Sequence, residues 1–377
     1  MTPTAPQSPQ TPQPPELVPG QLVGAGRYTL RWMLAAGGTC RVWLARDERL
    51  GDTVALKFLQ PHLAHDPTLI AELRKEAAAN RQLTHQNIVQ LYDIYESPTE
   101  APFLVMEFVE GASLHTLRQQ KENEIYRWPE LRPILLQLCS ALDHAHGSQL
   151  IHRDLEPANI LIDLTGRVKL ADFGISASLA DAYVELLGQR DTRGTVTFMS
   201  PQQMDGEPAH PTDDVYALGA TLYELLASRA PFFTGDIGHQ VKQVPPQPIQ
   251  ACQQELKIDN PIPPNVAALI MACLRKNPDE RPQSAWEAAK HIDPSIGDPL
   301  VTIRVERIPS EGASDQVADS KKGFSWEFYV VIAVLLVLLI AALVLPRTLG
   351  VTHTGWVAWP GYLWFGVAVA MLSGMAF

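Results

Sequence analysis

The sequence lacks the features that mark several classes of protein. It holds only four cysteines, Cys40, Cys139, Cys252 and Cys273, among 377 residues, and none forms a Cys-x-x-Cys pair. This spacing predicts neither a disulfide framework nor a zinc site, and it favours a reducing compartment for the main domain. Basic residues are also few, since 30 Lys and Arg stand against 41 Asp and Glu, a net charge of −11. This acidic balance argues against a nucleic-acid partner, which would need a basic surface.

The first 22 residues contain no lysine, no arginine and no long apolar run, so they do not resemble a secretory signal peptide. Proline is the commonest residue among them. A segment of this composition buries too little apolar surface to fold, and we predict that residues 1–22 form a disordered tail. The whole chain is nevertheless 46% hydrophobic, which is enough for a packed core elsewhere.

Beyond the tail, the pattern of apolar residues changes once along the chain. Short runs bounded by Gly or Asp predict strands at residues 28–34, 41–46 and 53–59. Helical spacing of apolar residues predicts helices at residues 67–83, 131–146, 213–227 and 266–274. The sequence therefore predicts an α+β fold, with a small β-rich lobe at about 27–107 and a larger helical lobe at about 112–292.

The C-terminal part has the composition of a membrane anchor. Residues 293–323 carry Pro, Ser, Gly and mixed charge, and we predict a juxtamembrane linker there. Residues 328–345 carry no charge, and at about 1.5 Å per residue they would reach roughly 27 Å as a helix, enough to span a bilayer core. Lys321 and Lys322 precede this segment and Arg347 follows it, which favours a cytoplasmic side for the preceding domain.

A second uncharged segment, residues 356–377, contains several aromatic residues, three glycines and Pro360. It either crosses the membrane again, which would make a hairpin, or lies in the interfacial region. Both alternatives predict a membrane protein with one or two spans that contacts lipid through its C-terminal part.

A lysine behind a glycine-containing turn suggests phosphate binding. Lys57 lies in the third predicted strand, and the turn AAGGTCRV at residues 35–42 precedes it. Backbone amides of such a turn can surround phosphate groups while an ammonium group neutralises their charge. Glu76, in the following helix, offers a carboxylate that could hold Lys57 in an ion pair.

Two further motifs carry the clearest chemical signal. Residues 152–159 read His-Arg-Asp-Leu-Glu-Pro-Ala-Asn, and residues 172–174 read Asp-Phe-Gly. Asp154 could accept the proton of an attacking hydroxyl group. Asn159 and Asp172 supply oxygen atoms of the kind that Mg²⁺ prefers.

With Lys57 and these motifs in this order, the chain resembles protein kinases of the eukaryotic-like type over residues 27–292. It is most similar to the bacterial membrane-anchored serine/threonine protein kinases. The resemblance implies a two-lobed protein kinase fold, here followed by a transmembrane helix or hairpin. It implies transfer of the γ-phosphate of ATP to Ser or Thr hydroxyls of protein substrates, autophosphorylation, and a need for Mg²⁺ or Mn²⁺. A homodimer is also compatible with the family.

The resemblance also implies roles for individual residues. Asp154 would be the catalytic base, Lys57 would bind phosphate and pair with Glu76, and Asn159 and Asp172 would hold the metal. The remaining ATP-binding residues would be Gly37, Val42, Ala55, the gatekeeper Met106, the hinge from Glu107 to Val109, and Leu161. The activation-loop threonines would be Thr192, Thr195 and Thr197, with Thr192 as the phosphorylation site paired with Arg153. Asp214 would be the buried anchor at the start of the long helix through the large lobe, and Arg281 would pair with the end of the substrate segment.

Departures from the family pattern occur at four positions. Ala35 and Cys40 replace two glycines of the phosphate-binding loop, which limits close approach of the backbone. Gln202 replaces the glutamate expected to pair with Arg281, so the charge-assisted pair is lost and a structural cost is expected. Glu156 occupies the place of a lysine that would steady the transferred phosphate. These departures raise the alternative of a weakly active or inactive pseudokinase that binds nucleotide or docks proteins.

The charge at Glu156 leads to a prediction. Two like charges about 4 Å apart repel by roughly 4 kcal/mol at an effective dielectric constant of 20. We therefore expect Glu156→Lys to raise kcat in a kinase assay, because it removes this repulsion from the γ-phosphate. A fall in kcat would show that the site is adapted to the carboxylate.

Overall fold

The computed structural model describes residues 17–38, 40–60, 63–64, 66–98, 100–173, 195–293 and 295. The predictions for the linker beyond residue 295, for the segments 328–345 and 356–377, and for Thr192 lie outside the described residues. Part of the predicted tail is ordered, because Leu22 pairs with Thr29 in the first two strands. Among the described residues, no helix has both the length and the apolar character needed to cross a bilayer.

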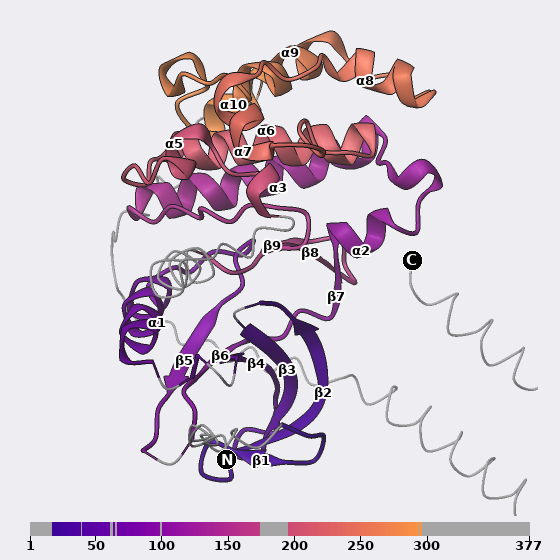
Figure 1. Ribbon diagram of the computed structural model, residues 1–377. Helices are drawn as coiled ribbons and strands as arrows, with labels where there is room; N and C mark the ends of the chain where they lie inside the picture. The colour runs from indigo at the N-terminus through magenta and orange to yellow at the C-terminus, as the bar shows by residue number, and fades with distance from the viewer. Residues whose placement is uncertain are drawn as a thin grey trace, which may run out of the picture. The chain divides into compact units, whose positions relative to one another are not determined.

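The N-terminal lobe is a six-stranded antiparallel sheet with one helix beside it (Figure 1). The strand order across the sheet is β1-β2-β3-β4-β6-β5. Its strands are β1 (Leu22–Val23), β2 (Tyr28–Ala36), β3 (Cys40–Asp47), β4 (Thr53–Leu59), β5 (Leu91–Tyr95) and β6 (Phe103–Glu107). The three strands predicted from alternation correspond to β2, β3 and β4. Strand β6 was not predicted, because it is buried on both faces and shows no alternation.

Strand β4 lies inside the sheet and places Lys57. Successive side chains of a strand point to opposite faces, so Lys57 shares a face with Ala55 and Leu59. That face packs against helix α1 (Pro67–Asn80) through Leu69 and Leu73. The fold thus holds a lysine on the apolar face of the sheet, and its ammonium group reaches Asp172 of the other lobe.

Helix α1 begins and ends at identifiable side chains. The Asp66 carboxylate accepts hydrogen bonds from the backbone N–H groups of Thr68 and Leu69 at the N-terminus. The helix ends at Asn80, three residues before the predicted end at Leu83. The Asn80 amide instead donates to the backbone carbonyl of Phe173, 2.9 Å away. This bond connects the helix to the segment that follows β9.

A separate short three-stranded sheet begins just after the link between the lobes. It contains β7 (Gly111–Ser113), β8 (Ile160–Asp163) and β9 (Val168–Leu170), and all its pairs are antiparallel. Gly111 has no room for a side chain, because a Cβ atom there would lie 2.0 Å from the carbonyl oxygen of Ile162. The close approach of β7 to β8 therefore requires glycine at this position.

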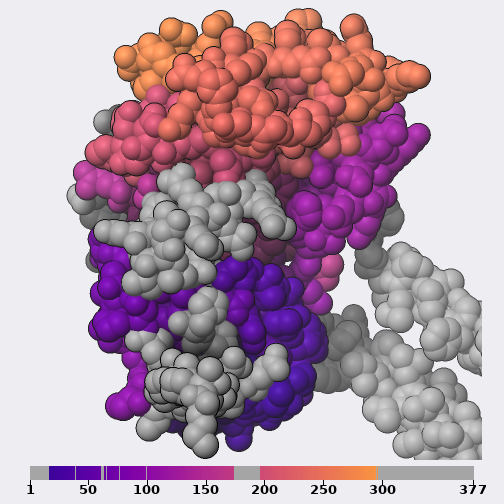
Figure 2. Space-filling model, in the orientation of Figure 1, coloured from indigo at the N-terminus to yellow at the C-terminus, as the bar shows by residue number. Residues whose placement is uncertain are grey.

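The C-terminal lobe is helical, and Figure 2 shows it in magenta and orange above the indigo N-terminal lobe. Its described helices are α2 (Leu114–Arg118), α3 (Trp128–Gly147), α5 (Pro201–Met204), α6 (Pro211–Ala227), α7 (Ile237–Gln243), α8 (Ile249–Leu256), α9 (Pro264–Cys273) and α10 (Ala285–Ile292). Three 3₁₀ turns occupy Glu122–Glu124, Thr195–Thr197 and Pro278–Glu280. Helix α3 starts three residues before the predicted position, where the Arg127 N–H donates to the Glu130 carboxylate.

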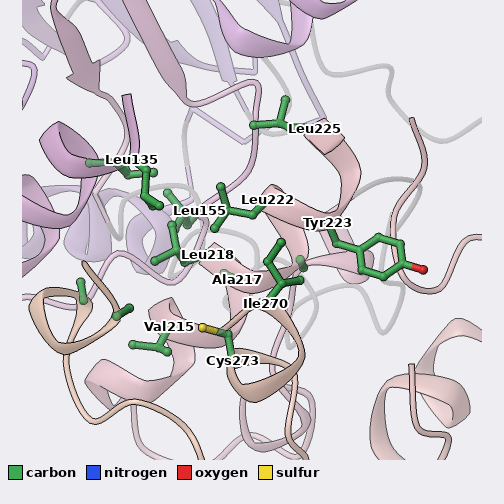
Figure 3. Close-up of a cluster of buried hydrophobic side chains, with 14 of the residues drawn as sticks. Leu135, Leu155, Val215, Ala217, Leu218, Leu222, Tyr223, Leu225, Ile270 and Cys273 are labelled. Carbon is green, nitrogen blue, oxygen red and sulfur yellow. The ribbon is translucent and has the colours of Figure 1, made fainter. Parts of the chain in front are cut away.

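Helix α6 is the centre of this lobe. Every residue of it except Pro211 and Glu224 is buried, as expected of a helix packed on all sides. Figure 3 shows Val215, Leu218 and Leu222 of α6 near Ile270 and Cys273 of α9. The contact between α6 and α9 therefore forms a main part of the core.

Gly219 makes this close contact between α6 and α9 testable. A Cβ atom at Gly219 would lie 2.5 Å from the Cβ atom of Cys273 and 3.3 Å from the Ile270 carbonyl oxygen. We expect Gly219→Ala to lower the free energy of unfolding by about 1–3 kcal/mol, since overpacking forces neighbours apart. Urea unfolding followed by circular dichroism at 222 nm would measure the change.

The matched control is Gly147→Ala at the end of α3, where a Cβ atom meets nothing within 4 Å. This variant should be as stable as the parent protein or up to about 1 kcal/mol more stable. Equal stability of the two variants would contradict the packing argument.

Candidate active site

A buried carboxylate at the start of α6 holds the loop that carries His152, Arg153 and Asp154. Asp214 is fully buried and accepts hydrogen bonds from the backbone N–H groups of His152 and Arg153, both at 2.8 Å, and from His146 Nε2 at 2.7 Å. Burial alone would raise the pKa of Asp214, but the hydrogen bond and charge of His146, together with the backbone N–H of His152, bring it below its ordinary value. The anchoring role that the resemblance implied for Asp214 has this physical basis.

The loop is strained where it passes Asp214. Arg153 has a φ of +63°, in the left-handed region that non-glycine residues rarely adopt. Such a conformation persists only when surrounding contacts enforce it. Here the two N–H bonds to Asp214 enforce it, and they set the direction in which Asp154 leaves the loop.

His152 connects the two catalytic segments. Its Nε2 donates to the carbonyl of Ala171 at 2.8 Å, and its Nδ1 accepts the backbone N–H of Asp154 at 3.2 Å. Burial lowers the pKa of His152, so the ring stays neutral with its proton on Nε2. The ring also meets the edge of Phe173, with centroids 4.6 Å apart. A neutral His152 therefore holds the segment before Asp172 against the loop that carries Asp154.

Lys57 reaches from the N-terminal lobe to Asp172. Its ammonium nitrogen lies 2.8 Å from a carboxylate oxygen of Asp172, and the lysine is only 3% exposed. Burial alone would lower the pKa of Lys57, but the charges of Asp172, Cys40 and Asp154 raise it above its ordinary value. The predicted partner Glu76 belongs to α1, but its side chain lies outside the described residues.

Asp154 and Asn159 face each other within the loop. The Asn159 amide nitrogen donates to the backbone carbonyl of Asp154 at 2.8 Å and to its carboxylate at 3.0 Å. Burial and the nearby charge of Asp172 raise the pKa of Asp154 to about 7, although Lys57 and Asn159 act in the opposite direction. A carboxylate with a pKa near neutrality suits a general base.

The predicted metal ligands have the right donor atoms. The amide nitrogen of Asn159 donates to Asp154, so its side-chain carbonyl oxygen is the atom that could bind a metal. Asp172 supplies carboxylate oxygens. Oxygen donors from one or two carboxylates are what Mg²⁺ accepts from proteins, with substrate phosphates completing the shell. Within the described ranges, no three His, Cys, Asp or Glu side chains are grouped as metal ligands. The residues therefore fit a metal held jointly with a nucleotide.

The predicted adenine pocket lies along the neighbouring strands. Ala55 of β4 is paired with Met106 of β6, and Val42 of β3 is paired with Lys57. Leu161 lies in β8 on the other lobe. The resemblance implies that Val42, Ala55 and Leu161 enclose the adenine ring and that Met106 is the gatekeeper, and these roles stay predictions.

The predicted hinge is fixed by contacts that sequence reasoning missed. The backbone N–H of Glu107 donates to the Gln90 carbonyl, and the Glu107 carboxylate lies 2.7 Å from the ammonium group of Lys169. Glu107 is thus committed to the protein through both groups, which leaves the other backbone groups of the hinge as candidates for adenine. No sequence signal indicated the ion pair, because its partners are far apart in the chain.

The phosphate-binding loop is held at its base. The Gly37 N–H donates to the Cys40 carbonyl at 2.8 Å, and Gln60 donates to the Gly37 carbonyl. Ala35 pairs with Val42 within the sheet. Cys40 is buried and close enough to Lys57 to influence the pKa of that lysine, so this departure lies beside the residue predicted to bind phosphate.

Gln202 is better accommodated than the sequence predicted. Its carbonyl oxygen accepts a 2.6 Å hydrogen bond from Arg281, as predicted, and its amide nitrogen also donates to the Lys276 carbonyl at 3.0 Å. Arg281 is 3% exposed and donates further bonds to the carbonyls of Arg275 and Thr212. A glutamate at 202 could not make the bond to Lys276, so the amide offsets part of the expected cost.

Glu156 is half-buried beside the base, in a region of negative charge. Burial, followed by the charges of Asp154, Glu224 and Asp172, raises the pKa of Glu156 to about 8. Near neutral pH in the free protein it therefore holds a proton for most of the time. The repulsion predicted from the sequence was calculated for a fully ionised Glu156. It is weaker in proportion to the fraction of Glu156 that is protonated.

The substrate segment is described only from Thr195 onward. Thr195 and Thr197 form a 3₁₀ turn, and Thr197 lines a cavity together with Glu156 and Phe198. The side chain of Thr195 lies outside the described residues, as does the whole of Thr192. The roles predicted for these threonines stay predictions.

The geometry agrees with comparisons to known proteins. The family model for the protein kinase domain matches residues 28–292. This chain belongs to the protein kinase family. Its sequence is 37% identical over 274 residues to the serine/threonine-protein kinase PknB of Mycobacterium tuberculosis, and 36% identical over 273 residues to PknB of Mycolicibacterium smegmatis. Each alignment covers 69% of this chain.

The relatives and the solved structures differ in what they support. The chain spans only 41% of the length of each PknB relative. A crystal structure of the M. tuberculosis PknI kinase domain matches with a TM-score of 0.58 and 24% identity, over 74% of this chain and 98% of that one. The structure titled PpkA-294 apo form gives a TM-score of 0.60 at 22% identity, over 74% of this chain and 99% of that one. These structural likenesses support the two-lobed kinase fold.

The raised pKa of Glu156 predicts a pH dependence of stability in the free kinase domain. Between pH 4.5 and 8, the folded protein keeps a proton that the unfolded chain has lost. Unfolding then becomes easier as pH rises through this range. Glu156→Gln removes this contribution. At pH 8 the free energy of unfolding of the variant should therefore be higher than that of the parent protein by about 1 kcal/mol or more. At pH 4.5 the two should be equal.

Thermal unfolding between pH 4.5 and 8, without nucleotide or metal, would measure this difference. Glu207→Gln is the matched control, because Glu207 is exposed and its replacement should leave the pH dependence unchanged. Equal pH profiles for the parent protein and Glu156→Gln would contradict the assignment.

Proposed function

We propose that this protein is a serine/threonine protein kinase that transfers the γ-phosphate of ATP to hydroxyl groups of protein substrates. The convergence of Lys57, Asp154, Asn159 and Asp172 at the cleft between the lobes is the observation that carries this proposal. The names of the PknB relatives support the choice of serine and threonine. The pseudokinase alternative finds no support in these relatives.

The residues of the cleft divide the chemistry among them. Lys57 binds negatively charged phosphate oxygens of ATP, and its pairing with Asp172 positions the two groups together. Asn159 and Asp172 would hold Mg²⁺ or Mn²⁺, which neutralises charge on the phosphates. Asp154 orients the substrate hydroxyl and accepts its proton as the oxygen attacks the γ-phosphorus and the bond to the β-phosphate breaks.

The proposal includes how the kinase domain is regulated and how it is attached to a membrane. Arg153 next to the base would pair with a phosphate on Thr192 after autophosphorylation, since a phosphate group adds charge that arginine recognises. Residues 328–345 would anchor the kinase domain on the cytoplasmic face of a membrane, and residues 356–377 would cross it again or lie at the interface. A homodimer would bring two activation loops together.

A phosphorylation assay tests the proposed activity. The full-length protein in detergent, incubated with Mg²⁺ and γ-labelled ATP, should label itself and a generic protein substrate. Asp172→Asn should lower the labelling at least a hundredfold, because it removes the partner of Lys57 and a metal ligand. Asp279→Asn, which alters an exposed aspartate, should leave it unchanged. Absence of labelling in the parent protein would contradict the proposal.

A further inference from the structure

The second half of strand β2 carries an exposed apolar surface. Trp32, Met33 and Leu34 follow one another in the strand and are 57%, 49% and 41% exposed. All residues from 31 to 36 are exposed, whereas Leu30 in the same strand is fully buried. Three consecutive large apolar side chains are thus in contact with solvent, and we call them the β2 surface.

The β2 surface is exposed because one edge of the strand is left open. Strand β3 pairs with β2 along its whole length, but β1 pairs with it only at Tyr28 and Thr29. Among the described residues, no strand pairs with this second edge of β2 beyond Leu30. Figure 1 shows β2 at the outer side of the N-terminal sheet, beside β3. Exposed apolar edges of this kind favour association, and proteins commonly cover them.

The N-terminal tail contains a regular repeat of proline. A proline occurs at every third position from 3 to 15, namely at Pro3, Pro6, Pro9, Pro12 and Pro15. A polyproline II helix has three residues per turn, so these five side chains would lie along one face of it, which we call the proline ridge. Gln7, Gln10 and Gln13 would share another face. The repeat therefore predicts a polyproline II helix with one apolar and one polar face.

The tail joins the described structure close to the β2 surface. Leu17 packs against the apolar cluster that contains Leu30. The Gly20 N–H donates to the Leu30 carbonyl at 2.8 Å, and Leu30 is only two residues from Trp32. At about 3.1 Å per residue, residues 3–15 would extend over roughly 40 Å, against roughly 20 Å for the exposed half of β2. The tail is therefore long enough to lie along this surface.

The chemistry of the two partners is complementary. Proline-rich segments bind to aromatic surfaces with a small loss of entropy, because the polyproline II conformation is already favoured before binding. Residues 1–15 carry no charged side chain, so packing of the proline ridge would remove no side-chain charge from water. Proline has no backbone N–H group, and the tail would therefore bind through its rings rather than as an added strand.

We propose that residues 3–15 dock as a polyproline II helix on the β2 surface of the same chain, with the proline ridge against Trp32. The tail buries too little apolar surface to fold alone, and the β2 surface supplies the missing contact. Attachment beside Leu30, sufficient length and the repeat of proline identify the tail as the occupant. The inference does not depend on the proposed kinase activity.

Oxidation by hydroxyl radicals, followed by mass spectrometry of the full-length protein in detergent, would test this docking. Replacement of the five ridge prolines by alanine should raise the oxidation rates of Trp32 and Met33 about threefold or more, because their cover is lost. The matched control replaces Gln7, Gln10 and Gln13 by alanine, which keeps the ridge and should leave both rates unchanged. Tyr92 in β5 is 50% exposed and should react equally in all variants.

Cross-linking would identify the chain that supplies the tail. Ser8→Cys and Arg31→Cys place one thiol in the tail and one beside Trp32, while the four native cysteines are buried. A short bismaleimide should link this pair within one chain. Addition of Trp32→Ala should lower the yield about fivefold or more. Leu164→Ala, an exposed substitution in the other lobe, should leave the yield unchanged.

The possible outcomes decide between the occupants of the surface. Equal oxidation of Trp32 and Met33 in the parent protein and the proline variant, as detergent or lipid on the surface would give, overturns the proposal. An unchanged cross-linking yield in Trp32→Ala also overturns it. Links formed only between two chains would assign the surface to the tail of a second copy and would overturn docking within one chain. Loss of protection in the proline variant, together with links within one chain that require Trp32, would establish the inference.

Discussion

The hydrogen bonds to the buried carboxylate of Asp214 are the constraint on which the rest of the site depends. They hold His152 and Arg153 by their backbones, and they keep Arg153 in a left-handed conformation that it would not adopt alone. Asp214 itself belongs to α6, which is buried on nearly all sides. The central helix of the lobe therefore sets the position of Asp154. The catalytic loop is held in place by the packed core through this helix.

The site brings more carboxyl groups together than positively charged groups. Asp154 and Glu156 lie close to Asp172, and burial strengthens the repulsion among them. Lys57 compensates Asp172 directly, while Asp154 and Glu156 respond with raised pKa values. This imbalance would suit a site that gains positive charge from a metal ion bound together with the nucleotide.

The departures from the family pattern are absorbed to different degrees. Gln202 replaces an ion pair by two hydrogen bonds, one from Arg281 and one to Lys276, so Arg281 keeps its place in the core. Cys40 fits into the sheet opposite Leu59 and remains buried. Glu156 has neither a hydrogen bond nor an ion pair among the described residues, so this departure is not compensated there in the way that Gln202 is.

The sequence by itself determined the fold class, the catalytic motifs and three strands of the N-terminal sheet, because periodicity and short motifs depend on neighbouring residues. It did not reveal the pairing of Lys57 with Asp172, the ion pair of Glu107 with Lys169, or the second hydrogen bond of Gln202. Only the tertiary structure decided these contacts, and with them the raised pKa of Asp154 and the isolation of Glu156. The physical reason is that burial and the distances between charges arise when distant segments pack together.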